Sequence, residues 1–223
     1  MAAGVLFDLD ETLLDRAASV AAYGLKFYSD FESAIESERE SFLATFLLLD
    51  GQGYVPRERF FESMSNAMGA GGPDAEVIAS HFAAHAWQEP TLMQGAAEGL
   101  RRLRDAGVPL AVVTNGGSSN QRKKLVNSGL DQLVDEICIS EELGVRKPHP
   151  DIFRHALDRL GVRADRSWFV GDNPQADVIG AAAVGCRTIW LRRTLPWPDD
   201  QPLRYTAVVD TLEPVFDWIL GSV

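Results

Sequence analysis

Carboxylates follow two separate hydrophobic segments of the chain. The segment 4–8 ends in Asp8, and Asp10 lies two residues further on, while the segment 168–171 is followed by Asp172. Carboxylate oxygens form a hard site suited to Mg²⁺, which binds proteins through few carboxylates and keeps several of its waters. We therefore expect Asp8 and Asp172, together with a backbone carbonyl, to hold this cation.

Groups that could bind an anion follow other hydrophobic segments. Thr114, Asn115 and Gly116 stand at the end of the segment 108–114 and offer a hydroxyl and backbone amides, and Lys147 offers a positive charge. A lysine and a divalent cation would also relieve the repulsion between neighbouring carboxylates. These residue types together predict a site for a phosphoryl group.

Asp8 and Asp10 have the side chains that covalent phosphate chemistry needs. Asp8 could attack phosphorus as a nucleophile and form an acyl phosphate. Asp10 could protonate the leaving oxygen and later accept a proton from the attacking water. General acid–base catalysis supplies only about 10²–10⁴-fold in rate. The rest of an acceleration that reaches ~10²¹-fold for phosphate monoesters must come mostly from electrostatic stabilisation and positioning.

Strands and helices alternate in the part of the chain that must position these residues. Besides a strand over 4–8, strands are expected over 108–114, 136–139, 168–171, 187–191 and 208–209, with helices over 98–106, 118–128, 150–161, 176–184 and 211–220. Strands without polar alternation, separated by helices, indicate a parallel sheet covered on both faces. The active site of such a sheet lies beyond the carboxyl ends of its strands. We therefore expect an α/β fold with a Rossmann-like parallel-sheet core.

A different pattern interrupts this core after its first strand. Between residues 16 and 93, apolar residues recur at helical spacing. Helices are expected before Gly51, from a first turn that contains Pro56, and over 73–87. The predicted domains are a discontinuous α/β core, residues 1–15 and 94–223, and an inserted all-helical domain, residues 16–93.

Composition limits the partners. The 223 residues carry a formal net charge of -11, and an acidic surface repels nucleic acid and anionic lipid. We expect no signal peptide, because the first residues run directly into a short apolar strand without a basic start, and no apolar segment is long enough to span a bilayer. Cys138 and Cys186 are expected to be buried thiols. We expect a cytoplasmic monomer or homodimer that acts on a small phosphorylated metabolite.

The order of these residues resembles the haloacid dehalogenase-like hydrolase superfamily. The matching residues are Asp8-x-Asp10-x-Thr12, Thr114, Lys147 and Gly171-Asp172-x4-Asp177. The position of the insert matches the helical cap that one subfamily carries after its first strand. Further matches over 114–121, 140–148 and 183–191 are similar to bacterial nucleotidases and acylneuraminate phosphatases.

The resemblance implies a role for each residue. Asp8 is expected to be the nucleophile and Asp10 the acid and base. Mg²⁺ is expected on Asp8, Asp172 and the backbone carbonyl of Asp10. Thr114 and Lys147 are expected to bind the phosphoryl group.

Asp177 is expected near Lys147 or a metal-bound water. Glu11 replaces a glycine found in many members, and Asn173-Pro174 replaces a more usual small or hydroxyl pair. Neither change removes a catalytic group.

The favoured function is Mg²⁺-dependent hydrolysis of a phosphate monoester, of the sugar phosphate or nucleoside monophosphate class, with the cap closing over the site. A phosphosugar mutase and a non-catalytic phosphometabolite-binding protein remain alternatives. Carbon–halogen hydrolysis is disfavoured because it would need no aspartate at position 10. Phosphonate cleavage is disfavoured because nothing marks Lys26, the single lysine of the insert, as an imine former.

Several other residues are expected to have ordinary structural roles. Arg122, Lys123 and Lys124 are predicted to form an exposed face of a helix. His81 and His85 are predicted to be packed or solvated, because no third metal ligand accompanies them. Phe27 and Trp87 are predicted to lie in a hydrophobic core.

Overall fold

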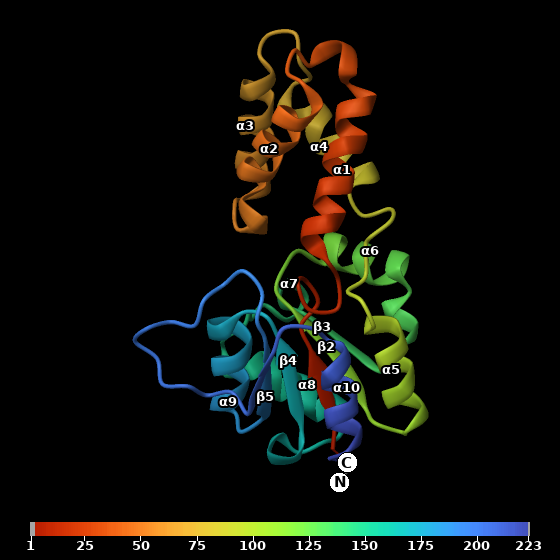
Figure 1. Cartoon of the computed structure of the whole chain (residues 1–223), viewed down its shortest axis with the longest axis vertical. Helices are drawn as coiled ribbons and strands as arrows, with labels where there is room; N and C mark the ends of the chain where they lie inside the picture. The colour runs from red at the N-terminus through yellow and green to blue at the C-terminus, as the bar shows by residue number, and fades with distance from the viewer. Residues whose placement is uncertain (1–2, 223) are drawn as a thin grey trace. The chain divides into compact units, whose positions relative to one another are not determined.

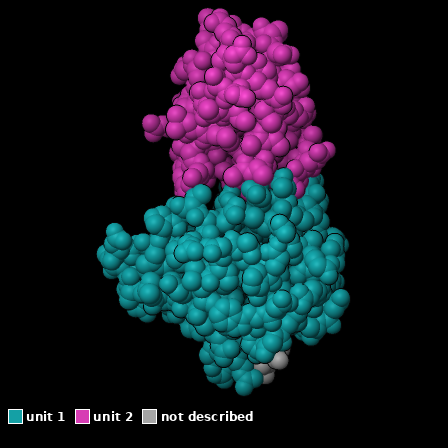
Figure 2. Space-filling view, in the orientation of Figure 1, with its two compact units in different colours: residues 1–15, 91–223 teal, residues 16–90 magenta. Residues whose placement is uncertain are grey.

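The computed structural model describes residues 3–222 and divides the chain into two compact units (Figures 1 and 2). Unit 1 consists of Met1–Asp15 and Thr91–Val223, and unit 2 of Arg16–Pro90. The chain therefore returns from unit 2 to unit 1 three residues earlier than predicted. Leu92 forms a bridge with Leu14, and the Met93 N–H donates to the Leu13 carbonyl, so these residues belong with unit 1.

The core of unit 1 is a six-stranded parallel sheet with the order β3-β2-β1-β4-β5-β6 (Figure 1). Its strands are β1 (Val5–Phe7), β2 (Leu110–Thr114), β3 (Glu136–Ile139), β4 (Trp168–Gly171), β5 (Arg187–Leu191) and β6 (Ala207–Val209). The predicted α/β fold is confirmed. The predicted bounds of β3, β4 and β5 agree with those observed.

Helices cover both faces of this sheet. The α-helices of unit 1 are α5 (Ala96–Asp105), α6 (Ser118–Ser128), α7 (Ser140–Leu143), α8 (Pro150–Leu160), α9 (Gly180–Ala183) and α10 (Glu213–Leu220). Val5 and Phe7 of β1 pack on the face that α5 and α10 cover, and Leu6 packs on the face that α8 and α9 cover. This alternation of side chains follows from the pleat of a strand, and it explains why β1 is apolar throughout.

Short helical turns connect these elements. The 3₁₀ turns of the chain are Glu32–Ala34, Gly51–Gly53, Leu130–Gln132 and Ala164–Arg166, and a π-helical turn spans Pro174–Ile179. The single helix predicted over 176–184 is thus a π-helical turn that runs into α9. The difference begins at Asn173, whose side chain accepts hydrogen bonds from the Gln175 and Ala176 N–H groups and so caps the turn.

Unit 2 is helical, with α1 (Arg16–Asp30), α2 (Arg39–Asp50), α3 (Arg57–Met68) and α4 (Ala75–His85). Aromatic side chains dominate its core, and Phe27 and Trp87 are buried there as predicted. Helix α2 ends before Gly51, which adopts a left-handed φ of 54°. Pro56 precedes α3 as its cap rather than lying in its first turn.

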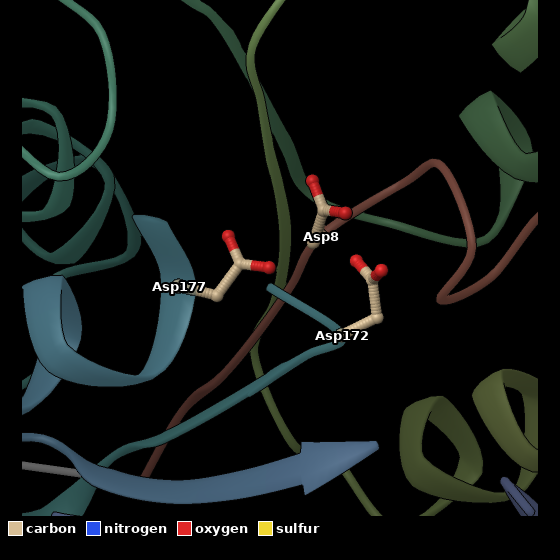
Figure 3. A group of neighbouring side chains, drawn as sticks. All are labelled: Asp8, Asp172 and Asp177. Carbon is tan, nitrogen blue, oxygen red and sulfur yellow. The ribbon is translucent and has the colours of Figure 1, made fainter. Parts of the chain in front are cut away.

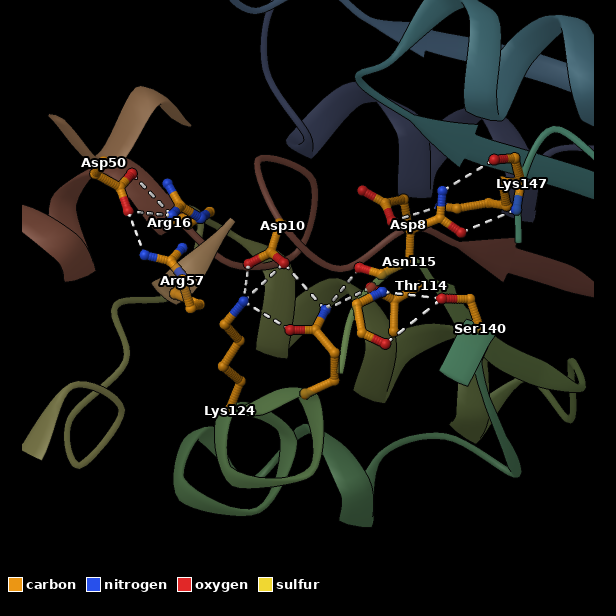
Figure 4. A network of polar contacts seen from close by, with 12 residues as sticks. Asp8, Asp10, Arg16, Asp50, Arg57, Thr114, Asn115, Lys124, Ser140 and Lys147 are labelled. Atoms are coloured by element: carbon orange, nitrogen blue, oxygen red, sulfur yellow. Dashed lines mark hydrogen bonds and ion pairs between the residues drawn. The ribbon is translucent and has the colours of Figure 1, made fainter. Parts of the chain in front are cut away.

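Two polar clusters lie within unit 2. Asp50 is buried and accepts hydrogen bonds from the guanidinium groups of Arg16 and Arg57 (Figure 4). His81 contacts the Tyr23 hydroxyl at 3.1 Å and the Asp30 carboxylate at 2.9 Å. The packed role predicted for His81 is therefore confirmed.

In residues 3–222, no helix is long and apolar enough to cross a membrane.

Candidate active site

Three neighbouring strands place acidic and hydroxyl side chains at one edge of the sheet. Strand β1 pairs with β2 on one side and β4 on the other. Asp8 follows β1, Thr114 ends β2 and Asp172 follows β4. All three side chains are buried. The strands are parallel, so their carboxyl ends meet where ligands bind in open α/β sheets.

Lys147 links two of the carboxylates. Its Nζ lies 2.6 Å from Asp8 Oδ1 and 2.7 Å from Asp177 Oδ1, and the side chain is almost completely buried. Burial alone would lower the pKa of Lys147, but Asp177 and Asp8 outweigh it and the net shift is upward. Lys147 is therefore a fixed positive charge in contact with Asp8.

Three carboxylates gather beside this lysine. Asp8, Asp172 and Asp177 each offer an oxygen, and these oxygens lie within 4.8 Å of one another (Figure 3). Burial raises the pKa of Asp8 to about 7, although Lys147 opposes the shift. Burial, followed by repulsion from Asp177 and Asp8, raises the pKa of Asp172 to about 9. Lys147 alone thus does not offset the cost of ionising these carboxylates, and buried oxygen ligands of this kind fit a divalent cation that would favour their ionised form.

The position of Asp177 follows from close packing of the backbone. Its Oδ2 accepts a hydrogen bond from the Asn173 N–H at 3.0 Å. A Cβ at Gly171 would come within 2.5 Å of this carboxylate, so no other residue fits position 171 without displacing Asp177. The structure therefore places Asp177 against Lys147, the first of the two surroundings expected for it.

Asn115 and Gly116 make contacts that the sequence did not indicate. The Asn115 side chain donates to the Lys147 carbonyl at 3.0 Å and accepts from the Lys147 N–H at 2.9 Å. The Gly116 N–H donates to Ser140 Oγ at 3.0 Å. Asn115 therefore anchors the backbone of Lys147. Binding of a phosphoryl oxygen by the Gly116 amide would require that its bond to Ser140 open.

Asp10 contacts a second lysine, which sequence reasoning missed. Lys124 is 3% exposed, and its Nζ lies 2.8 Å from both carboxylate oxygens of Asp10 (Figure 4). The prediction that Lys124 lies on an exposed helical face is therefore wrong. The missed signal was its spacing, because Lys124 follows Gln121 by three residues and thus lies on the same side of the helix. Gln121 is also buried, at 2% exposure.

Comparison with known proteins places the chain in a family. The model of the haloacid dehalogenase-like hydrolase family matches residues 2–185. The chain belongs to the haloacid dehalogenase-like hydrolases. The predicted resemblance is thereby confirmed.

Relatives of this hydrolase include named phosphatases. It is 38% identical to phosphoserine phosphatase of Thermus thermophilus over 72% of this chain and 64% of that protein. It is 33% identical to glyceraldehyde 3-phosphate phosphatase of Methanopyrus kandleri over 86% of this chain and 85% of that protein. The magnesium-bound structure of YfnB from Bacillus subtilis has the same fold, with a TM-score of 0.75 at 24% identity over 98% of each chain.

The turn after β1 in this haloacid dehalogenase-like hydrolase contains one departure from the family pattern. Glu11, which stands where many members have glycine, adopts a φ of 58°. Left-handed backbone favours glycine because it lacks a Cβ. The Glu11 carboxylate lies 3.5 Å from the Arg193 guanidinium. This ion pair ties the strained turn to the chain that follows β5.

Proposed function

We propose that this hydrolase is a phosphatase that cleaves a small phosphate monoester through an acyl phosphate on Asp8. The observation that carries the proposal is the contact of Asp8 with Lys147, beside Asp172 and at the end of the central strand. A carboxylate held against a buried cation, with a second acidic group for a metal, has the parts that transfer of a phosphoryl group to an aspartate requires.

The first half of the reaction forms the intermediate. An Asp8 oxygen attacks phosphorus while the bond from phosphorus to the substrate oxygen breaks. Asp10 gives its proton to that leaving oxygen, and the product alcohol departs. Lys147 and the Thr114 hydroxyl stabilise the charge on the phosphoryl oxygens.

The second half returns the enzyme to its starting state. The Asp10 carboxylate, now deprotonated, takes a proton from a water molecule, and the oxygen of this water attacks phosphorus. The bond between phosphorus and Asp8 breaks and inorganic phosphate leaves. Asp10 is then protonated again, and no further reactant is needed.

The metal of this site is Mg²⁺ in our proposal. Asp8, Asp172 and the backbone carbonyl of Asp10 would hold it, and Asp177 would bind one of its waters. When bound, the cation neutralises charge on the phosphoryl group and orients it for in-line displacement. The clustering and the raised pKa values of Asp8 and Asp172 support this assignment.

Asp10 separates this function from carbon–halogen hydrolysis and from non-catalytic binding, but not from a mutase. Hydrolysis of a carbon–halogen bond needs no proton donor for its leaving halide, whereas an alcohol leaving group does. A phosphosugar mutase uses the same groups but returns the phosphate to the sugar. A non-catalytic binding protein would have no need of Asp10. The acidic side chains of all the predicted catalytic positions are present, which favours the enzyme.

The substrate proposed is a sugar phosphate, a nucleoside monophosphate or a similar small metabolite. The relatives named for phosphoserine and glyceraldehyde 3-phosphate support a compact monoester. We propose that unit 2, Arg16–Pro90, acts as the cap that selects it. The cytoplasmic location and the monomeric or dimeric state stay predictions.

The test is release of inorganic phosphate by the purified protein with Mg²⁺ from a panel of phosphate monoesters. We expect turnover of at least one compound, and loss of turnover in Asp8→Asn and Asp172→Asn. Asp105→Asn, at the exposed end of α5, is the matched control and should retain activity. Folded protein that is inactive on the whole panel would overturn the proposal. Transfer of phosphate to another hydroxyl of the product would identify a mutase.

A further inference from the structure

Two buried polar side chains of α6 point toward the proposed acid and the proposed phosphoryl-binding hydroxyl. Gln121 and Lys124 lie three residues apart and contact each other, with Lys124 Nζ 2.7 Å from Gln121 Oε1. Burial of a lysine and a glutamine is costly unless both are hydrogen-bonded. Their partners therefore indicate what they do.

Lys124 holds Asp10. Its ammonium group donates to both carboxylate oxygens at 2.8 Å, so neither oxygen is left without this contact and the orientation of the carboxylate is fixed. The side chain of Asp10 is 22% exposed, whereas that of Lys124 is 4% exposed. A buried cation thus fixes a carboxylate that has access to solvent, and charge-assisted bonds of this kind are among the stronger ones in proteins.

Gln121 links Asp10 to Thr114. Its Nε2 lies 3.0 Å from Asp10 Oδ2 and 2.6 Å from Thr114 Oγ1. The orientation of the amide follows from its neighbours. Lys124 can only donate, so it must face Oε1, and this leaves Nε2 to donate to Asp10 Oδ2.

The direction of the Thr114 hydrogen bond follows from the same argument. Since Gln121 Nε2 can only donate, the Thr114 hydroxyl oxygen is the acceptor in this contact. The proton of the hydroxyl is then directed away from Gln121. It is therefore oriented to donate to another acceptor, which in the proposed function is a phosphoryl oxygen.

We propose that Gln121 and Lys124 are positioning residues that set the Asp10 carboxylate and the Thr114 hydroxyl in a fixed geometry for phosphoryl transfer. Neither side chain needs to touch the substrate. The proposal rests on the proposed function, because it assigns a purpose to two of that function's groups. A merely structural pair would support α6 without affecting proton delivery.

The test compares two substrates under single-turnover conditions with Mg²⁺ and enzyme in excess. An alkyl phosphate needs a proton on its leaving oxygen, whereas p-nitrophenyl phosphate releases a stable anion. Lys124→Met should lower the single-turnover rate on the alkyl phosphate by roughly 10-fold or more, a part of the 10²–10⁴-fold that general acid catalysis supplies. The rate on p-nitrophenyl phosphate should change by less than about 3-fold, because misplacing the acid matters little there.

Gln121→Met is the second variant and has a second readout. It removes one hydrogen bond to Asp10 and the hydrogen bond that orients the Thr114 hydroxyl. The rate on the alkyl phosphate should therefore fall relative to the rate on p-nitrophenyl phosphate, as in Lys124→Met. It should also weaken inhibition by inorganic phosphate by roughly 3- to 10-fold, since a misdirected hydroxyl loses one hydrogen bond to the anion. Lys124→Met should leave this inhibition nearly unchanged. Lys123→Met, on the exposed side of α6, is the matched control for both readouts.

The outcomes separate the two proposals. If folded wild-type protein and Lys123→Met turn over neither p-nitrophenyl phosphate nor any alkyl phosphate of the panel, the proposed function fails and this inference fails with it. If wild type is active but Lys124→Met slows both substrates equally, or neither, the positioning role is wrong while the phosphatase stands. If Lys124→Met does not fold, the rate ratio and phosphate inhibition of Gln121→Met decide, and wild-type values for both would overturn the inference.

Discussion

The ammonium nitrogen of Lys147 lies 2.6 Å from Oδ1 of Asp8, although 139 positions separate the two residues in the chain. The parallel sheet makes this contact possible because β1 lies at its centre. Asn115 completes the arrangement by binding the backbone of Lys147 from the end of β2. The reactive carboxylate and its counter-charge are therefore held by separate parts of one rigid core.

Removal of the Lys147 charge should destabilise the protein. Lys147→Met leaves Asp8 and Asp177 buried without their cation, and breaking a buried ion pair typically costs about 3–5 kcal/mol. We expect a fall of this size in the free energy of unfolding, measured in urea without metal. Lys147→Met combined with Asp177→Asn should recover part of the loss. If the double variant loses as much free energy of unfolding as the two single variants lose together, the two residues do not interact.

The stability of the metal-free protein should fall as pH rises. The pKa of Asp172 is raised from an ordinary value of 3.8 to about 9, and that of Asp8 to about 7. Between pH 3.8 and each raised pKa, these carboxyl groups keep protons in the folded state that they have lost in the unfolded state. The free energy of unfolding therefore decreases as the pH rises. Asp172→Asn removes the larger of these two shifts. Its Tm without metal should therefore exceed that of wild type at about pH 8 by more than at about pH 6.

Mg²⁺ should reverse this trend, because it binds the ionised carboxylates. The rise in Tm that Mg²⁺ produces should be larger at about pH 8 than at about pH 6 in wild type, and nearly absent in Asp172→Asn. Differential scanning calorimetry at both pH values provides the measurement. Equal stabilisation of wild type and Asp172→Asn by Mg²⁺ would contradict the assignment of Asp172 as a ligand.

Asn115→Asp should impair catalysis through Lys147. The substitution keeps the shape of the side chain but sets a carboxylate oxygen, in place of the amide nitrogen, against the Lys147 carbonyl. Loss of this donor and repulsion between the oxygens should shift Lys147, and misplacement of a catalytic group by about 1 Å can cost about 10²-fold in rate. We expect kcat/KM for phosphate release to fall at least roughly 10-fold. Asn127→Asp, on the exposed side of α6, is the control, and equal activity in both variants would refute the anchoring role.

Unit 2 should depend on the buried carboxylate of Asp50. Asp50→Asn leaves the buried Arg16 guanidinium without its counter-charge and should lower the free energy of unfolding by about 3–5 kcal/mol. Lys26→Met removes an exposed i,i+4 ion pair with Asp30 and should cost only about 0.5 kcal/mol or less. Urea denaturation of both variants gives the comparison. Similar losses in the two would mean that burial of the Asp50 pair has no energetic consequence.

Much of the core could be predicted because its sequence patterns are local. Helix α6 and strands β3, β4 and β5 have the predicted bounds, since each is a short apolar or helical segment between clear turn residues. The residues after β1, β2 and β4 could be grouped because parallel strands place their carboxyl ends together. These inferences needed spacing and chemistry, and no knowledge of side-chain direction.

The contacts that the sequence could not indicate depend on side-chain direction over long separations. Lys124 stands in a run of three basic residues, which favoured an exposed face, yet it is buried against Asp10, 114 positions away. Asn115 was expected to offer its backbone amide to phosphate, and no contact was predicted for its side chain, which binds the backbone of Lys147. In both cases a loop from a distant part of the chain supplies the partner. Helical spacing could place Lys124 on the same side of α6 as Gln121, but it could not identify Asp10 as the partner.

The covalent intermediate on Asp8 tests the central claim most directly. Enzyme is mixed with Mg²⁺ and a ³²P-labelled monoester, quenched in acid during turnover and digested, and the labelled peptide is identified by mass spectrometry. The account predicts an acid-stable, base-labile phosphoryl group on the peptide that contains Asp8, and none in Asp8→Asn. Steady turnover with no label on that peptide, and unchanged phosphate release in Asp8→Asn, would contradict it.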